Sequence, residues 1–206
     1  MRKLLAVAAV FALCAATPAW ASWLEDFDAG IPATWTVVDN SVGGAAPWGT
    51  NADWSDDNYT DPAGLNTSLC AEANSDVPGS GVTVDTELIS HLFTVPAGAT
   101  LEFDTNYQSY TDLDFADTDI SVDGGSSWTN LLHWIPPDDE QGVWHGTGVH
   151  VSTDISSYAG QDAQIRFHYG DANWEWYFQV DNVAVTPEPG SLALLGLGAL
   201  ALIRRR

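Results

Sequence analysis

Acidic side chains are the most abundant groups in this sequence that could carry chemistry. The chain holds 28 Asp and Glu residues against six Lys and Arg residues, and all 28 acids lie between Glu25 and Glu188. In that interval Arg166 is the one basic side chain apart from histidines. Carboxylates bind Ca²⁺, and in pairs they hydrolyse glycosidic bonds. Their abundance therefore leaves both metal binding and hydrolysis open.

Motifs specific for catalysis are missing from the sequence. It contains no Gly-x-Ser-x-Gly segment and no His-Glu-x-x-His segment, which are the patterns of serine hydrolases and zinc peptidases. The five histidines are scattered at spacings that suggest no metal-binding trio. We expect a protein that is not an enzyme, with a polysaccharide hydrolase as the less favoured alternative because acids are so numerous.

The charge of the acidic interval limits the partners of the protein. One arginine against 28 acids gives a formal charge of −27 between Glu25 and Glu188. Such a field repels nucleic acid and anionic membrane surfaces, so we expect neither as a partner. Because cationic side chains that would offset the acids are almost absent, we expect folding to depend on calcium or on high ionic strength.

Tryptophan is the second unusual feature of the composition. Nine of the ten tryptophans lie within residues 22–186, which indicates a folded domain rather than a solvated acidic chain. Aromatic faces beside carboxylates and amides are typical of carbohydrate sites, and "NWEWYF" and "LLHWIPPDDEQGVWHG" combine these groups. If the protein binds sugar, we expect Trp134, Trp144 and Trp174 to be the exposed tryptophans that bind it. Packing between sheets is the more common role for a tryptophan of a jelly roll.

Short runs rich in β-branched and aromatic residues must position these side chains. Gly, Pro, Asn and Asp separate the runs, and helical periodicity is almost absent between the two ends of the chain. The predicted strands lie within residues 34–39, 86–95, 99–110, 118–123, 128–134, 148–155, 163–170 and 176–185. Eight to ten strands without intervening helices predict an all-β fold, an antiparallel jelly-roll sandwich that occupies residues 22–186 as one domain.

Three short patterns give local expectations. The Asp-Gly-Gly sequence at 123–125 predicts a hairpin, because glycine tolerates positive φ. Strand alternation places Arg166 on the outer face, where an ion pair with a carboxylate is favoured over ligand binding. A third pattern, "DLDFADTD", lacks the glycine and the glutamate of an EF-hand loop, so a solvated loop entering a strand is favoured over an ion site. Its acids are Asp112, Asp114, Asp117 and Asp119.

The N-terminus has the composition of a signal peptide. A basic start precedes an apolar run, and Ala19 and Ala21 stand at the small-residue positions of a signal peptidase site. We expect signal peptidase to remove residues 1–21. A membrane helix or a buried N-terminal helix is the alternative interpretation.

The C-terminus, "PEPGSLALLGLGALALIRRR", raises a question of length. Its uncharged run from Gly190 to Ile203 has 14 residues. As a helix the run would rise about 21 Å, whereas a hydrocarbon core is about 30 Å thick. The run is therefore a poor permanent anchor but an adequate transient one, with the terminal arginines on the cytoplasmic side.

This tail resembles the PEP-CTERM sorting signal over residues 187–206. The resemblance implies that an exosortase recognises and removes the tail after transient insertion into the inner membrane. We expect an exported protein of the cell surface or extracellular matrix of a Gram-negative-type bacterium, with an ordinary tail anchor as the alternative. The residues that carry the signal are Pro187, Glu188, Pro189, Arg204, Arg205 and Arg206.

The body resembles the bacterial choice-of-anchor J and cleaved-adhesin domains, which are jelly rolls related to the MAM domain. The matching segments are, in order, "EDFDAGIPATWTVVDN", "DTELISHLFTVPAGATLEFDTNY", "DISVDGGSSWTNL", "DISSYAGQDAQIRFHYG" and "WYFQVDNVAV". They cover most of residues 24–186, while residues 43–84 match poorly. The resemblance implies an adhesin-like interaction protein that binds other surface proteins or exopolysaccharide. A carbohydrate-binding module for exopolysaccharide is the alternative.

The same resemblance implies a structural calcium ion that joins the first strand to the last. Asp26 and Asp28 share one face of the expected first strand. The apolar alternation of the last strand slips at Asp181, which predicts a bulge that re-aims this side chain. Since Ca²⁺ takes six to eight oxygen ligands, we expect Asp28 and Asp181 to bind it, with Asp26 and Asp39 as further candidates.

Overall fold

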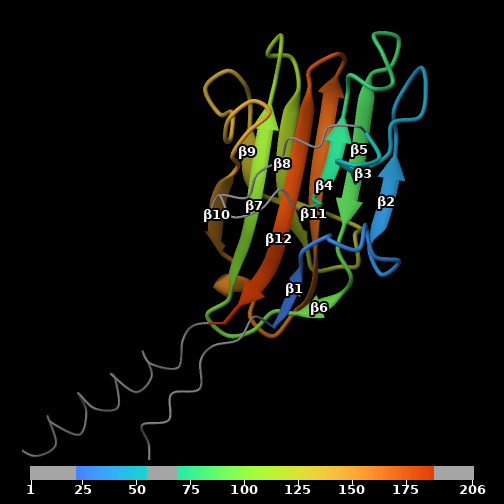
Figure 1. Ribbon diagram of the computed structural model, residues 1–206. Helices are drawn as coiled ribbons and strands as arrows, with labels where there is room; N and C mark the ends of the chain where they lie inside the picture. Colours follow the sequence, from blue (N-terminus) through green and yellow to red (C-terminus); the bar gives the residue numbers. More distant parts are fainter. Residues whose placement is uncertain (1–21, 55–68, 188–206) are drawn as a thin grey trace, which may run out of the picture.

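The computed structural model describes residues 22–54 and 69–187. In these residues the regular structure consists of twelve strands and one short 3₁₀ helix, η1 (Ser156–Tyr158). The strands form two antiparallel sheets that face each other as a sandwich (Figure 1). The predicted all-β sandwich of the jelly-roll type is therefore confirmed.

Each sheet contains six strands. The first has the order β10 (Val149–Asp154), β7 (Thr100–Gln108), β12 (Tyr177–Thr186), β4 (Ala71–Asn74) and β3 (Gly49–Thr50), with β1 (Trp23–Glu25) paired to β12. The second has the order β2 (Thr36–Asp39), β5 (Val84–Ile89), β11 (Asp162–Ala172), β8 (Phe115–Ser121) and β9 (Thr129–Trp134), with β6 (Phe93–Thr94) paired to β11. Every segment predicted as a strand contains one. The sequence analysis missed β3 and β4, which lie in the part that matches the related domains poorly.

Aromatic rings from both sheets fill the space between them. Phe103 of the first sheet meets Phe167 of the second edge to face, with ring centroids 5.1 Å apart. Alternation explains this arrangement, because every second residue of β5 and of most of β11 points inward and is buried. Such aromatic pairs contribute about 0.5–1.5 kcal/mol each beyond the area that they bury.

Trp134 belongs to this core, so the prediction that it is exposed is wrong. Its side chain is only 8% exposed, and its ring lies near those of Phe103, Tyr107 and Phe178. Trp134 is the last residue of β9 and is the only buried one in that strand. The inward face at this position needs a large apolar group to close the gap between the sheets.

The predicted bulge in the last strand is present. The pairing of β12 with β7 shifts register between Asp181 and Ala184, and Asn182 has a left-handed φ of 50°. After the shift the apolar side chains of Val183 and Val185 return to the core. One extra residue therefore lets a long strand keep its apolar face inward on both sides of the bulge.

The first strand is shorter than predicted. It pairs with β12, as expected for the first and last strands, but it ends at Glu25. Phe27 has a φ of 50° and is fully buried, and the Gly30 amide donates to its carbonyl, so the chain turns there. The prediction that Asp26 and Asp28 share one face of a strand is therefore wrong. Both are exposed residues of this turn.

The two ends of the domain lie together at one end of the sandwich. In Figure 1, β1 and the carboxyl end of β12 lie at the bottom. The connections β4–β5, β7–β8, β9–β10 and β11–β12 lie at the opposite end. Among the described residues no helix has the length and apolar character needed to cross a membrane. The predicted signal peptide, and the sorting signal beyond Pro187, lie outside the described residues.

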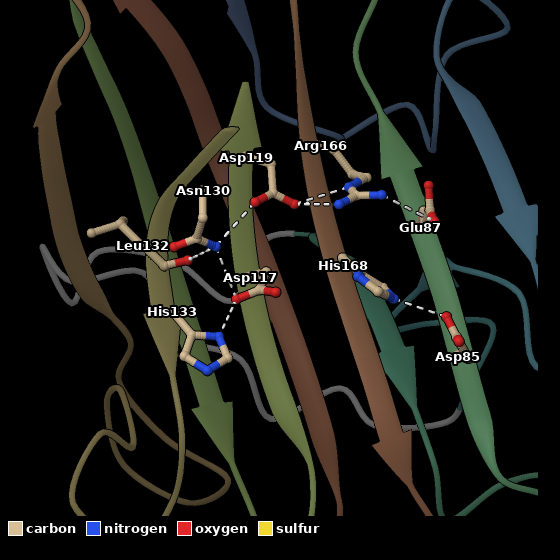
Figure 2. Close-up of polar contacts among 9 residues, drawn as sticks. All are labelled: Asp85, Glu87, Asp117, Asp119, Asn130, Leu132, His133, Arg166 and His168. Atoms are coloured by element: carbon tan, nitrogen blue, oxygen red, sulfur yellow. Dashed lines mark hydrogen bonds and ion pairs between the residues drawn. The ribbon is translucent and has the colours of Figure 1, made fainter. Parts of the chain in front are cut away.

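The outer face of the second sheet is polar and holds Arg166 (Figure 2). Its guanidinium donates from Nε and Nη2 to Asp119 at 2.9 and 2.7 Å, and Nη1 lies 3.2 Å from Glu87. The ring of Trp128 lies 4.6 Å from the guanidinium carbon. The predicted structural ion pair is therefore confirmed. Asp119 is only 3% exposed, so this member of the acidic segment is a buried partner of Arg166 rather than a solvated loop residue.

Candidate functional site

Exposed aromatic side chains gather at the end of the sandwich opposite the chain ends. Tyr110, Trp174 and Trp176, together with Asp76, line an open pocket of about 440 Å³. Tyr110 is 64% exposed and Trp174 is 53% exposed. The four side chains come from the connections β7–β8, β11–β12 and β4–β5, which meet at the top of Figure 1. We call these four residues the aromatic pocket. Exposed apolar groups collected in a concavity are typical of a binding site.

Trp144, from the β9–β10 connection, extends the aromatic surface. Its ring stacks on that of Trp176, with centroids 5.2 Å apart and planes inclined by 26°. Tyr110 lies on Trp176 as well, at 5.5 Å. Trp144 is 52% exposed, so the prediction of exposure is confirmed for Trp144 and Trp174. The pairing of these rings was not predicted, because it joins connections far apart in the sequence.

Glu175 positions the pocket from below. Its side chain is 1% exposed, and its carboxylate accepts hydrogen bonds from the Ser109 hydroxyl, from the Tyr110 amide and from both the amide and the hydroxyl of Thr111. Its own amide donates to the Ser75 hydroxyl at 2.7 Å. A buried carboxylate is stable only when donors of this kind surround it. Glu175 thereby joins the three connections that supply the pocket.

The backbone of the β11–β12 connection is strained where it presents the rings. Trp174 has a φ of 62° and Trp176 a φ of 74°. This left-handed region is unfavourable for a bulky residue and costs about 1–3 kcal/mol each time. The Ser75 amide donates to the Trp176 carbonyl at 2.8 Å and helps to hold this conformation. Two strained tryptophans on either side of a buried acid indicate that ring placement has a role other than stability.

The turn that carries Trp144 is also fastened to the first sheet. Asn106 of β7 donates from Nδ2 to the carbonyls of Val143 and Gly146, at 2.9 and 3.2 Å. The amide of His145 donates to the Tyr177 hydroxyl at 2.8 Å. The aromatic surface is therefore held by buried polar groups of the strands, so little ordering is needed when a ligand binds.

A second buried carboxyl, Asp114, lies beneath this end. It is 2% exposed, and neither of its oxygens meets hydrogen-bond geometry with a described group. Burial raises its pKa to about 6, and the charge of Glu175 raises it further, while the nearby hydroxyls of Ser109 and Tyr169 lower it. The pKa of Tyr107 is also raised, by burial and by the charge of Asp114. Asp114 was expected to be solvated, and that expectation is wrong.

The surroundings of the pocket are acidic. No Lys or Arg occurs in any of the four connections at this end. Arg166 lies on the outer face of the second sheet and is engaged by two carboxylates (Figure 2). The exposed acids of the four connections are Asp76, Asp112, Asp138, Asp139 and Glu140, and Asp171 is exposed near the end of β11.

The bulge in β12 brings two carboxyl groups together. Asp181 pairs in register with Asp104 of β7, and the two are 1% and 8% exposed. Asn182 donates from Nδ2 to both, at 2.9 Å to Asp104 and 3.3 Å to Asp181. The other oxygen of Asp104 lies 2.7 Å from Nδ1 of His150. The sequence analysis identified the bulge but missed Asp104, because strand pairing is not visible in the sequence.

The other predicted calcium ligands, Asp26, Asp28 and Asp39, make contacts of their own. Asp39 fixes a turn by accepting from the amides of Ser41 and Ala46 at 3.1 and 2.9 Å. Asp26 accepts from the amide of Asp28 at 3.2 Å, and Asp28 lines a separate pocket. In residues 22–54 and 69–187, no three His, Cys, Asp or Glu side chains are grouped so that they could hold a metal ion. The four predicted residues therefore do not form one ligand set made of their side chains.

Comparison with known proteins adds a sorting signal. The PEP-CTERM protein-sorting motif matches residues 185–206, which agrees with the predicted signal at 187–206. The motif indicates an exported protein that is sorted to the cell surface, and it implies processing by an exosortase. Comparison with curated protein sequences gave no match.

Solved structures with a similar fold include adhesin and carbohydrate-binding domains. The K1 cleaved adhesin domain of Lys-gingipain from Porphyromonas gingivalis W83 is 23% identical, with a TM-score of 0.60, over 81% of this chain and 98% of that chain. The K3 domain of the same protein is also 23% identical, with a TM-score of 0.55, over 81% and 99%. A structure described as carbohydrate-binding modules of the β-sandwich superfamily is 14% identical, with a TM-score of 0.51, over 82% and 63%. The chain thus combines a PEP-CTERM signal with the fold of the cleaved adhesin domains.

Proposed function

We propose that this protein is a non-catalytic, adhesin-like binding protein of the cell surface or extracellular matrix, and that its aromatic pocket binds polysaccharide. The observation that carries the proposal is the pocket itself. Three aromatic residues and one carboxylate surround it, and Glu175 holds their connections in place. Sugar rings have an apolar face that stacks on tryptophan and hydroxyl groups that donate to carboxylates, so this combination suits them.

The position of the pocket supports the proposal. The sorting motif begins at the carboxyl end of β12, and the connections that supply the residues of the pocket lie at the opposite end of the sandwich (Figure 1). A protein attached through its C-terminal side would therefore direct the pocket away from its attachment point. This geometry suits a protein that contacts the surrounding polymer.

The exposed aromatic surface favours binding over hydrolysis. Glu175 already accepts several hydrogen bonds, and Asp76 is exposed at the pocket wall. A general acid for glycoside hydrolysis needs a raised pKa and access to the substrate. Asp114 has the raised pKa but is buried beneath the pocket.

The test is binding to a panel of neutral and matrix polysaccharides. We expect Trp174→Ala to weaken binding about tenfold, because stacking on an aromatic ring contributes roughly 1–2 kcal/mol. Trp128→Ala is the matched control. The Trp128 ring packs on Arg166, on the outer face of the second sheet and away from the pocket. Unchanged binding in Trp174→Ala, or no binding by the folded protein, would refute the proposal.

We also propose a structural calcium ion at the bulge of β12. Asp104 and Asp181 supply two buried carboxyl groups on neighbouring strands, and such groups with the carbonyls of a bulge are suitable calcium ligands. A cation here would offset two negative charges, in addition to His150, whose Nδ1 lies 2.7 Å from Asp104. Asp104 replaces Asp26, Asp28 and Asp39 as the proposed partner of Asp181.

A further inference from the structure

The charge of the aromatic pocket limits the kind of sugar that it can bind. Among the described residues that line it, Asp76 is charged and the others are Tyr110, Trp174 and Trp176. Exposed acids at the same end of the sandwich, such as Asp112 of the β7–β8 connection and Asp171 near the end of β11, add negative potential. A uronic acid or a sulfated sugar would meet repulsion here, with no Lys or Arg in the four connections to offset it.

The same groups attract a cation. Aromatic rings are negative on their faces, and an ammonium group near a ring face gains about 0.5–2 kcal/mol, depending on how much water is excluded. A carboxylate at the edge of the rings adds an ion pair of about 0.2–1 kcal/mol at an exposed position. Rings and a carboxylate around one pocket therefore suit a ligand that carries a positively charged amine on a ring able to stack on an aromatic side chain.

We propose that the aromatic pocket binds an amino sugar through its protonated amine, as found in a de-N-acetylated polysaccharide. In this assignment a sugar ring stacks on the exposed ring of Trp174, and its ammonium group faces Asp76. The inference rests on the proposed polysaccharide binding and names the class of sugar. It distinguishes this pocket from a site for neutral or anionic chains.

The test compares three soluble oligomers by calorimetry at a mildly acidic pH. They are a β-1,4-linked glucosamine hexamer, the same hexamer fully N-acetylated, and an oligogalacturonate. We expect the glucosamine hexamer to bind about three- to tenfold more tightly than the acetylated one, and the galacturonate not to bind. The preference should shrink as salt is added, because it is electrostatic.

Variants separate the pocket from the general negative field of the protein. Asp76→Asn should reduce the preference for the amine about threefold or more, while leaving the affinity for the acetylated hexamer nearly unchanged. Asp162→Asn removes the same charge at the start of β11, at the far end of the sandwich, and should leave the preference intact. Trp174→Ala should weaken both hexamers.

The outcomes distinguish this inference from the proposed function. Equal or tighter binding of the acetylated hexamer, lost in Trp174→Ala, would overturn the amine preference and leave polysaccharide binding in place. Equal effects of Asp76→Asn and Asp162→Asn would show that the pocket does not recognise the amine. That result would also overturn the proposed amine preference. Binding of neither hexamer to the folded protein would remove the polysaccharide function as well.

Discussion

Glu175 separates two tryptophans whose backbone is left-handed, and its buried carboxylate accepts hydrogen bonds from Ser109, Tyr110 and Thr111. The sequence "NWEWYF" correctly indicated Trp174 as exposed, but strand alternation could not reveal which neighbours would share its pocket. Asp76 and Tyr110 lie 98 and 64 residues before Trp174 in the chain. Only tertiary contact brings them to Trp174, so no local pattern identifies them. Trp134 shows the reverse error, because a tryptophan beside acids in the sequence can still face the core.

Replacing Glu175 with glutamine should loosen the pocket from below. The neutral amide of glutamine is a weaker acceptor than a carboxylate, and its NH₂ group would face the N–H and O–H donors that now bind Glu175. We therefore expect a loss of about 2–3 kcal/mol in the free energy of unfolding. Urea unfolding measures this loss. The control is Glu140→Gln, an exposed acid whose one described bond is from the Ser109 amide. A Glu175→Gln variant as stable as the control would show that the anchor is unimportant.

Asp114 makes stability depend on pH in a defined direction. Its pKa rises from 3.8 to about 6 on folding, so folding favours the neutral form. This contribution is fully present below pH 3.8 and is lost as the pH rises through about 6. At neutral pH, Asp114→Asn should therefore be more stable than the natural protein by up to about 3 kcal/mol.

Thermal melting at several pH values tests this expectation. The gain from Asp114→Asn should fade toward pH 4, while Asp112→Asn, an exposed change in the same connection, should give little gain at any pH. A gain in Asp114→Asn that does not vary with pH would mean that burial of the charged carboxyl is not the cause.

At the scale of elements, the sequence was informative where alternation or turn chemistry acts locally. The hairpin at 123–125 forms because Gly124 and Gly125 adopt positive φ and Asp123 accepts hydrogen bonds from Ser127. The slip at Asp181 in the apolar pattern of β12 predicted the bulge. In contrast, β3 has two residues and β4 is buried on both faces, so neither shows the alternation that identifies a strand.

The length of β1 was predicted wrongly for a related reason. The three residues of β1 are too few to show an alternating pattern. In the sequence Phe27 looks like an inward-facing strand residue, but in the structure its ring is buried by a left-handed turn. The ligand set proposed for calcium depended on that strand. Consequently the position of the bulge was predicted correctly. Asp104, the partner of Asp181, became visible only through the pairing of β7 with β12.

At the scale of the whole molecule, charge is the dominant property. The formal charge of −27 between Glu25 and Glu188 opposes compaction, and Arg166 offsets only its own neighbours. Calcium at the bulge and salt in solution would both relieve this repulsion, but they differ in specificity. A bound ion acts at micromolar to millimolar concentration, whereas screening needs far more salt.

Melting in EDTA, in millimolar calcium and in sodium chloride of equal ionic strength separates the two effects. We expect calcium to stabilise the protein by about 3–4 kcal/mol once it exceeds its dissociation constant a hundredfold or more. Asp181→Asn and Asp104→Asn should remove this response, and Asp39→Asn should keep it. Loss of the response only in Asp39→Asn, or equal melting in EDTA and calcium, would contradict the bulge site.

The pairing of β1 with β12 has a practical consequence for handling the protein. Since both chain ends of the domain emerge at one pole, a label or a biotin attached near Ser22 lies beside the carboxyl end of β12, where the sorting motif begins, and at the pole opposite the connections that line the pocket. Coating a bead through that label would therefore display the molecule in the orientation expected on a cell, without any need for the native sorting machinery.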